Sequence, residues 1–196
     1  MKIYCVTALA ISILCSCTGD SKKSSSPTDV TEKKIDSFFP VTSFIRGQLI
    51  TLDSMPVTPL QITMINKKTD SVWVPKEKLK PLLMPFLVPE ITETNLVKYF
   101  TETRFNDQTL NAITFTYDPI NTIPDSIELR HWDVYIDPET GYVVKVYIVK
   151  KIKENGQNLT QQLTWQTSKM AKITTILNRP GGDMQLVKEV MLLWKF

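Results

Sequence analysis

Residues 127–167 read IELRHWDVYIDPETGYVVKVYIVKKIKENGQNLTQQLTWQT, and this stretch decides the fold. Three runs in which apolar and polar residues alternate are separated by two turn-like segments, DPETG at 137–141 and ENGQ at 154–157. Alternation with a period of two is typical of a strand with one buried face, and Asn-Gly between two such runs is a strong hairpin signal. We therefore predict three antiparallel strands, at 127–136, 142–153 and 159–167.

The same pattern continues to the C-terminus. Ser168-Lys169 and the segment PGGD at 180–183 mark two further turns, and the apolar runs after them predict strands at 170–177 and 184–196. Together with the three strands above, they make a five-strand meander.

Two more hairpins are expected upstream. Residues 60–65 and 71–74 flank the polar turn 66–70, and residues 97–105 and 113–117 alternate on either side of Asn106-Asp107. For the start of the second hairpin, the stretch Leu96–Phe100 is also compatible with a helical turn.

The segment between these hairpins, residues 76–88, is apolar but rich in proline. Pro81, Pro85 and Pro89 each remove a helical hydrogen bond, so the segment makes at most two short turns. It either crosses the edge of the core or forms a mobile lid.

An amphipathic helix is expected near the N-terminus of the folded part. Apolar residues recur every three to four positions, and Asp36 or Ser37 can cap the helix with Pro40 in its first turn. The apolar positions are Phe38, Val41, Ile45, Leu49 and Leu52. The predicted fold class is α+β: a bent antiparallel sheet of about nine strands packed on this N-terminal helix.

The first residues are typical of a secretory signal peptide. Lys2 is followed by an uncharged stretch at 3–14 that is too short to span a bilayer, and small residues follow it. We expect residues 1–16 to be a signal peptide, residues 17–34 a lipidated Cys17 with a flexible Ser/Thr/Lys-rich tether, and residues 35–196 one α+β domain.

The sequence Leu14-Cys15-Ser16-Cys17 resembles the lipobox of bacterial lipoproteins, in particular those of Bacteroidota. The resemblance implies cleavage before Cys17 and acylation of its thiol and amine, with palmitate-like chains as the membrane anchor. Thr18, rather than Asp, at the next position implies sorting to the outer membrane, with the periplasmic face favoured over surface display. The competing interpretation, a secreted protein with disulfides, is disfavoured because all three cysteines lie within the first 17 residues.

Three Asp-Ser-apolar triplets resemble the acceptor of the O-glycosylation system of Bacteroidota. The resemblance implies modification at Ser54, Ser71 or Ser126, although Asp-Ser is also ordinary turn chemistry.

Composition excludes several classes of function. The chain has 196 residues, 42% hydrophobic residues, one histidine and a formal net charge of +3; loss of Lys2 with the signal peptide leaves +2. A nearly neutral domain is not an electrostatic nucleic-acid binder, and six glycines without a phosphate-binding loop disfavour nucleotide chemistry. We expect no cofactor.

Few residues suggest a catalytic or metal-binding site. His131 and Asp133 share one face of a strand, but no serine completes a triad. We therefore expect His131 to be an exposed strand residue without a catalytic role. Asp133, Asp137 and Glu139 could offer oxygen ligands to calcium, but their spacing matches no calcium loop. The basic residues at 150–153 are expected to be solvated. We therefore predict no catalytic residues, no metal site and no enzyme activity.

Two functions are compatible with these features. The first is a non-enzymatic binding or adaptor module for another envelope component. The second is a carrier of an apolar ligand, lipid or lipoprotein, in a half-barrel pocket, similar in outline to the lipoprotein-localisation factors of Gram-negative envelopes. The pocket would be lined by the tryptophans of predicted strands, Trp73, Trp132, Trp165 and Trp194.

Overall fold

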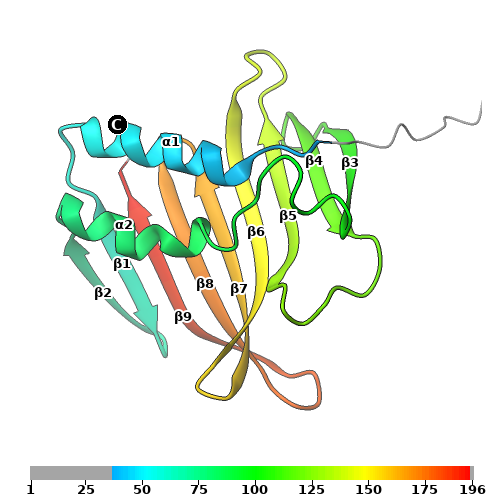
Figure 1. The fold of residues 1–196 in the computed structure, drawn as a ribbon. Helices are drawn as coiled ribbons and strands as arrows, with labels where there is room; N and C mark the ends of the chain where they lie inside the picture. The colour runs from blue at the N-terminus through cyan, green and yellow to red at the C-terminus, as the bar shows by residue number, and fades with distance from the viewer. Residues whose placement is uncertain (1–36, 195–196) are drawn as a thin grey trace, which may run out of the picture. The chain divides into compact units, whose positions relative to one another are not determined.

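The computed structural model describes residues 37–194, and one antiparallel sheet of nine strands dominates this part of the chain (Figure 1). The strands follow one another across the sheet in the order β2-β1-β9-β8-β7-β6-β5-β4-β3, so the sheet is open, with β2 and β3 at its edges. Their bounds are β1 Leu60–Ile65, β2 Lys68–Trp73, β3 Phe100–Asp107, β4 Ala112–Pro119, β5 Leu129–Ile136, β6 Val143–Glu154, β7 Gln157–Gln166, β8 Met170–Asn178 and β9 Met184–Leu193. The predicted antiparallel sheet and its C-terminal meander are confirmed.

Tight turns set the register of the hairpins. Asn155 and Gly156 join β6 to β7 with φ values of 50° and 76°, the left-handed pair that a type I′ turn requires. Asn66 and Lys67 join β1 to β2 in the same way, with φ values of 49° and 66°. The predicted five-residue turn at 66–70 is therefore too long, and β2 begins at Lys68.

The N-terminal helix, α1, spans Val41–Ser54. Pro40 occupies the N-cap position without a side-chain cap, so the predicted placement of Pro40 in the first turn and the cap at Ser37 are wrong. Asp36, the other predicted cap, lies outside the described residues. Proline is tolerated at the start of α1 because an N–H group at this position would have no acceptor within the helix.

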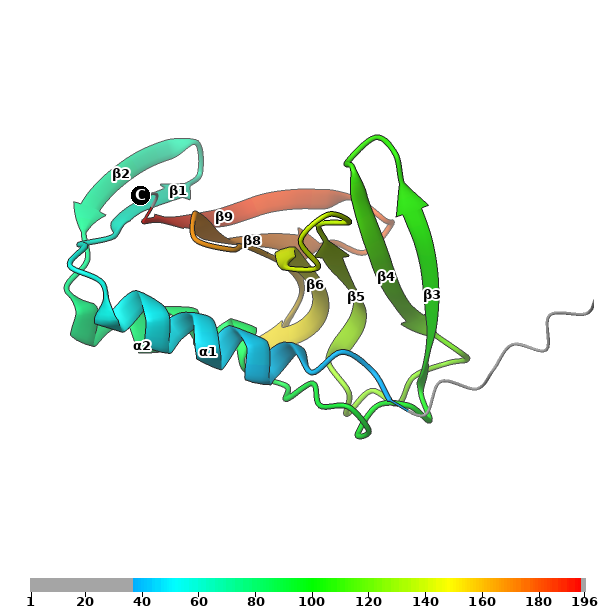
Figure 2. The ribbon, with the colours of Figure 1, turned by 90° about the horizontal axis from the view of Figure 1, so that it is seen from above.

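The proline-rich segment, residues 76–88, forms three short turns rather than the predicted two. They are η1 (Lys76–Lys78), α2 (Leu79–Leu83) and η2 (Met84–Phe86). Leu79, Leu83 and Phe86 are buried, so the segment belongs to the core. Figures 1 and 2 show α1 and α2 side by side on one face of the sheet, which we call the inner face; the opposite one is the outer face.

One cluster of buried apolar side chains contains residues of both the sheet and the helices. Aromatic contacts to the sheet come from Phe86 in η2 and from Phe38, which precedes α1. The ring centroid of Phe38 lies 5.0 Å from that of Tyr117 and 5.9 Å from that of Trp132. Within α1, Thr42 instead accepts a hydrogen bond from Ile91 N–H at 2.7 Å. Direct packing of the sheet on α1 therefore stays a prediction.

Within residues 37–194, no helix has the length and apolar character needed to cross a membrane.

Candidate functional site

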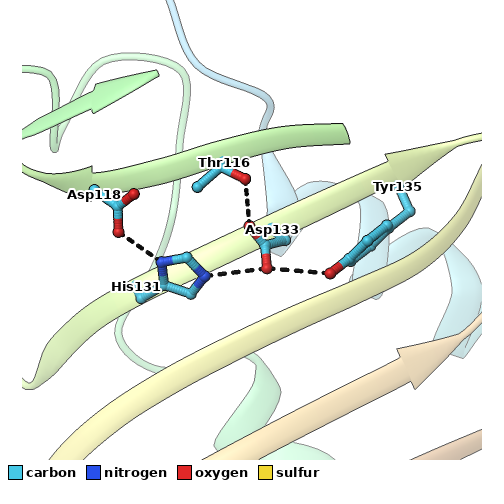
Figure 3. A network of polar contacts seen from close by, with 5 residues as sticks. All are labelled: Thr116, Asp118, His131, Asp133 and Tyr135. Carbon is cyan, nitrogen blue, oxygen red and sulfur yellow. Dashed lines mark hydrogen bonds and ion pairs between the residues drawn. The ribbon is translucent and has the colours of Figure 1, made fainter. Parts of the chain in front are cut away.

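A network of polar side chains lies on the outer face of β4 and β5 (Figure 3). Thr116 lies opposite Asp133 in the antiparallel register, and alternation brings Asp118, His131 and Tyr135 to the same face. His131 Nδ1 lies 2.8 Å from Asp118 Oδ1, and Nε2 lies 3.0 Å from Asp133 Oδ2. The hydroxyls of Thr116 and Tyr135 donate to Asp133 at 2.7 and 3.2 Å.

The carboxylates keep the imidazole charged. The hydrogen bond to Asp133 outweighs the effect of burial and, with Asp118, raises the pKa of His131 to about 9. Burial acts to raise the pKa of Asp133, but hydrogen bonds from His131 and Thr116 lower it overall. Burial and the charge of Asp133 raise the pKa of Tyr135 to about 12. At neutral pH the network is an imidazolium held between two carboxylates.

This arrangement does not match acid–base or nucleophilic catalysis. A general base needs an unprotonated nitrogen, whereas both nitrogens of His131 are engaged and the ring is charged at neutral pH. The neighbouring hydroxyls, those of Thr116 and Tyr135, donate to Asp133 and not to His131, so the described side chains form no nucleophile–histidine pair here. The prediction that His131 is an exposed strand residue is wrong. Its side chain is partly buried and connects β5 to Asp118 on β4.

The acidic residues considered for calcium do not converge. Asp137 Oδ1 accepts the backbone N–H groups of Glu139 and Thr140 at 2.9 and 2.8 Å, which is ordinary turn chemistry. Asp133 belongs to the network above. In residues 37–194 no group of three or more His, Cys, Asp or Glu is arranged to hold a metal ion.

Lys150 departs from the sequence-based expectation. It was predicted to be solvated, but it lies on the inner face with 4% of its surface exposed. Its ammonium donates to the carbonyl oxygens of Pro85 and Val88 at 2.7 and 2.8 Å. The alternating pattern did not predict the burial of Lys150, because a lysine next to apolar residues is also typical of the polar end of a strand. Its neighbour Lys151 is exposed as predicted.

The four strand tryptophans have different environments. Trp73 is 64% exposed on the edge strand β2, so it does not line an enclosed pocket, contrary to the prediction. Trp132, Trp165 and Trp194 are buried in the core. Trp132 stacks on Tyr117 at 4.5 Å, and Trp165 contacts Phe86 and Trp194 at 5.5 and 5.1 Å between ring centroids. The indole N–H groups of Trp132 and Trp165 have no hydrogen-bond partner among the described residues.

The three serines of the acceptor-like triplets are all exposed. Ser54 ends α1, and its hydroxyl donates to Ile50 O at 2.9 Å. Ser71 lies in β2 and Ser126 in the turn before β5. Their glycosylation stays a prediction, as does acylation of Cys17, which lies outside the described residues.

The outer face carries an apolar patch that was not predicted from the sequence. Leu192 and Ala171 are buried on the inner face, so alternation turns their neighbours in β9 and β8 outward. Leu193 lies opposite both Met170 and Leu60, and Leu60 in turn lies opposite Trp73. The patch consists of Leu60, Ile62, Met64, Trp73, Met170, Met191 and Leu193, all partly or fully exposed. The alternation of Leu60, Ile62 and Met64 could have indicated it, had the pairing of β1 with β9 been known.

None of the family models, curated proteins or solved structures with which the chain was compared gives a match.

Proposed function

We propose that this protein is a lipid-anchored protein of the bacterial cell envelope, and that its domain is a non-enzymatic binding module. The anchor is supported by the lipobox-like sequence that ends at Cys17 and by the absence of cysteine after it. Two or more acyl chains on Cys17 suffice for stable anchoring. Thr18 after the cysteine favours the outer membrane, and the single acid in residues 18–23 favours its periplasmic face over surface display.

The observation that carries the binding role is the apolar patch on the outer face. Single exposed apolar residues are normal, but seven contiguous ones, six partly exposed and Trp73 exposed, on a sheet face that no described helix covers are typical of an interaction site. Methionine supplies three of them, and its flexible, polarizable side chain is common at such surfaces. In this proposal α1 and the proline-rich segment cover the inner face and leave the outer face for a partner.

The polar network supports a binding role over an enzymatic one. Its five side chains satisfy one another, and its imidazole is protonated at neutral pH. A group of this kind ties β4 to β5, which β6 and β7 separate from the patch, and so stiffens another part of the same sheet.

Two experiments test the proposal. Mass spectrometry of the full-length protein from a Gram-negative host should show a diacyl or triacyl mass on Cys17, absent in Cys17→Ala. A photo-crosslinking amino acid at Met191, in the native envelope, should label a discrete component, whereas the same group at Ile50 on α1, which is 70% exposed, should not. An unmodified mature chain would refute the anchor, and equal labelling from both positions would refute the contact face.

A second candidate, the carrier of an apolar ligand, is favoured by the unpartnered indole N–H groups of Trp132 and Trp165. A ligand with carbonyl oxygens between the inner face and the helices would satisfy them. Native mass spectrometry of the purified mature chain tests this candidate: a stoichiometric lipid mass supports it, and a ligand-free mass contradicts it.

A further inference from the structure

The apolar patch has a basic surround. Lys67 lies in the turn between β1 and β2, Lys169 in the turn before β8, and Lys172 lies opposite Met191 on the outer face. The nearby carboxylates are those of Glu189, 3.6 Å from the ammonium of Lys172, and Asp70, which accepts the N–H of Ser71. Three cations and two anions therefore surround the apolar surface.

Trp73 lies at the border of this surface. It is the exposed end of the row Trp73, Leu60, Leu193 and Met170, on the free edge of the sheet. An indole ring has an apolar body and one polar N–H, which suits the boundary between headgroups and acyl chains.

The tether does not supply an occupant for the patch. Between Cys17 and Asp36, the aliphatic residues are Val30 and Ile35. Two such side chains are too few to cover seven.

A second copy of the chain fits poorly. The patch extends over four strands and about four residue rises, which corresponds to roughly 200–300 Å² at the usual strand spacings. A stable interface needs about 800 Å² per partner. To reach that area, a dimer would also have to cover the charged pair Lys172–Glu189.

We infer that the occupant is a lipid surface with anionic headgroups, and that the outer face lies against the membrane to which Cys17 anchors the chain. This inference rests on the proposed function and names the partner of its contact face. A lipid surface needs no matching groove, its headgroups complement the lysines, and acylation supplies its proximity. The 20 residues from Cys17 to Asp36 extend to at most about 70 Å, so the tether allows this orientation.

The structure provides its own reporter. Trp73 is the exposed tryptophan, whereas Trp132, Trp165 and Trp194 are buried. The test uses the mature chain with Cys17→Ser, which contains every described strand and helix. Vesicles of phosphatidylcholine with a quarter phosphatidylglycerol should shift the tryptophan emission to the blue and carry the protein down on sedimentation. Pure phosphatidylcholine should do so less, and salt should weaken binding. Trp73→Phe should abolish the shift but not the sedimentation.

The variants separate the patch from the rest of the surface. Ile62→Glu with Met191→Glu should abolish sedimentation, whereas Ile50→Glu, the matched exposed apolar position on α1, should leave it unchanged. Lys67→Gln and Lys169→Gln should each weaken binding roughly fivefold. Circular dichroism confirms that each variant is folded.

The outcomes are distinguishable. No vesicle binding, combined with a protein crosslinked from Met191, would overturn the lipid inference and leave the contact face intact. Loss of binding in Ile50→Glu would also overturn it, because docking would then occur through the helices. No vesicle binding and no crosslink from Met191 would refute both the inference and the proposed contact face.

Discussion

The ammonium of Lys150 lies 2.8 Å from the carbonyl oxygen of Val88, 62 positions earlier in the chain. With the second bond to Pro85 O at 2.7 Å, it joins the middle of the sheet to the last turn of the proline-rich segment. Burial outweighs the attraction of Glu128 and lowers the pKa of Lys150 to about 8. A neutral amine has two N–H groups, which is the number that the two carbonyls accept, so both bonds survive deprotonation.

Lys150 should make the protein more stable as the pH rises from about 8. Its pKa is about 8 in the folded state, below the 10.5 of an ordinary lysine, so over this range the unfolded chain binds more protons. Stability then rises with pH. We expect the free energy of unfolding of the wild type to increase by about 1–2 kcal/mol relative to Lys150→Met between pH 8 and 9.5. Urea unfolding at several pH values measures this difference.

The matched control for this experiment is Lys151→Met. Lys151 is the next residue and is exposed, so its removal should leave the pH slope of the wild type intact. His131 contributes an opposite slope up to about pH 9, but it is common to all three proteins and cancels in the comparison. Parallel curves for the wild type and Lys150→Met would contradict the buried ammonium.

The histidine should titrate well above its ordinary range. The chain has a single histidine, so one set of imidazole resonances reports its pKa without assignment. We expect a value near 9 in the wild type by NMR. Because the hydrogen bond to Asp133 is the largest cause, Asp133→Asn should lower the pKa more than Asp118→Asn does. A wild-type value near 6.5 would show that the network does not form in solution.

The same network should stabilise the protein at neutral pH and below. The folded-state pKa of His131 is raised, so its contribution is complete below about pH 6.5 and disappears as the pH rises through about 9. We expect His131→Gln to cost about 1–2 kcal/mol at pH 6, a value reduced from the full shift because Asp118 is exposed. The cost should shrink towards pH 9.5 in urea unfolding.

Much of the sheet could be predicted from the sequence because its strands are joined by local turns. Asn155-Gly156 predicts the hairpin of β6 and β7, and the alternation in β5 to β9 predicts which side chains share a face. The pairing of β1 with β9 could not be predicted, because the two strands are more than a hundred residues apart and no turn joins them. The apolar patch depends on that pairing and was missed for the same reason.

The candidate site was predictable only in part. Alternation placed His131 and Asp133 on one face, but Asp118 and Thr116 reach them across a strand pair whose register the sequence does not state. Similarly, four tryptophans in strands suggested one apolar layer. Whether a strand residue is buried depends on its place in the sheet, and Trp73 is on the edge.

Removing a core ring should cost far more than removing the exposed one. Trp165 is 1% exposed and packs against Phe86 and Trp194, so Trp165→Ala leaves a cavity and should lower the free energy of unfolding by about 3–5 kcal/mol. Trp73→Ala removes the same side chain from the edge of the sheet and should cost less than about 1 kcal/mol. Chemical unfolding followed by circular dichroism compares them. A cost above 3 kcal/mol for Trp73→Ala would mean that β2 is covered in solution.

Glycine at the second position of the turn between β1 and β2 should stabilise the protein. Lys67 has a φ of 66°, where an L-residue with a side chain is strained, and Asn66 precedes it with a φ of 49°. Lys67→Gly would give Asn-Gly, the pair that already joins β6 to β7, and should raise the free energy of unfolding by about 0.5–1 kcal/mol. The control is Lys68→Gly, one residue later in β2, which should destabilise by a similar amount because glycine weakens a strand. If both variants lowered the midpoint of urea unfolding, the two-residue turn would be incorrect and the longer turn over 66–70 would be restored.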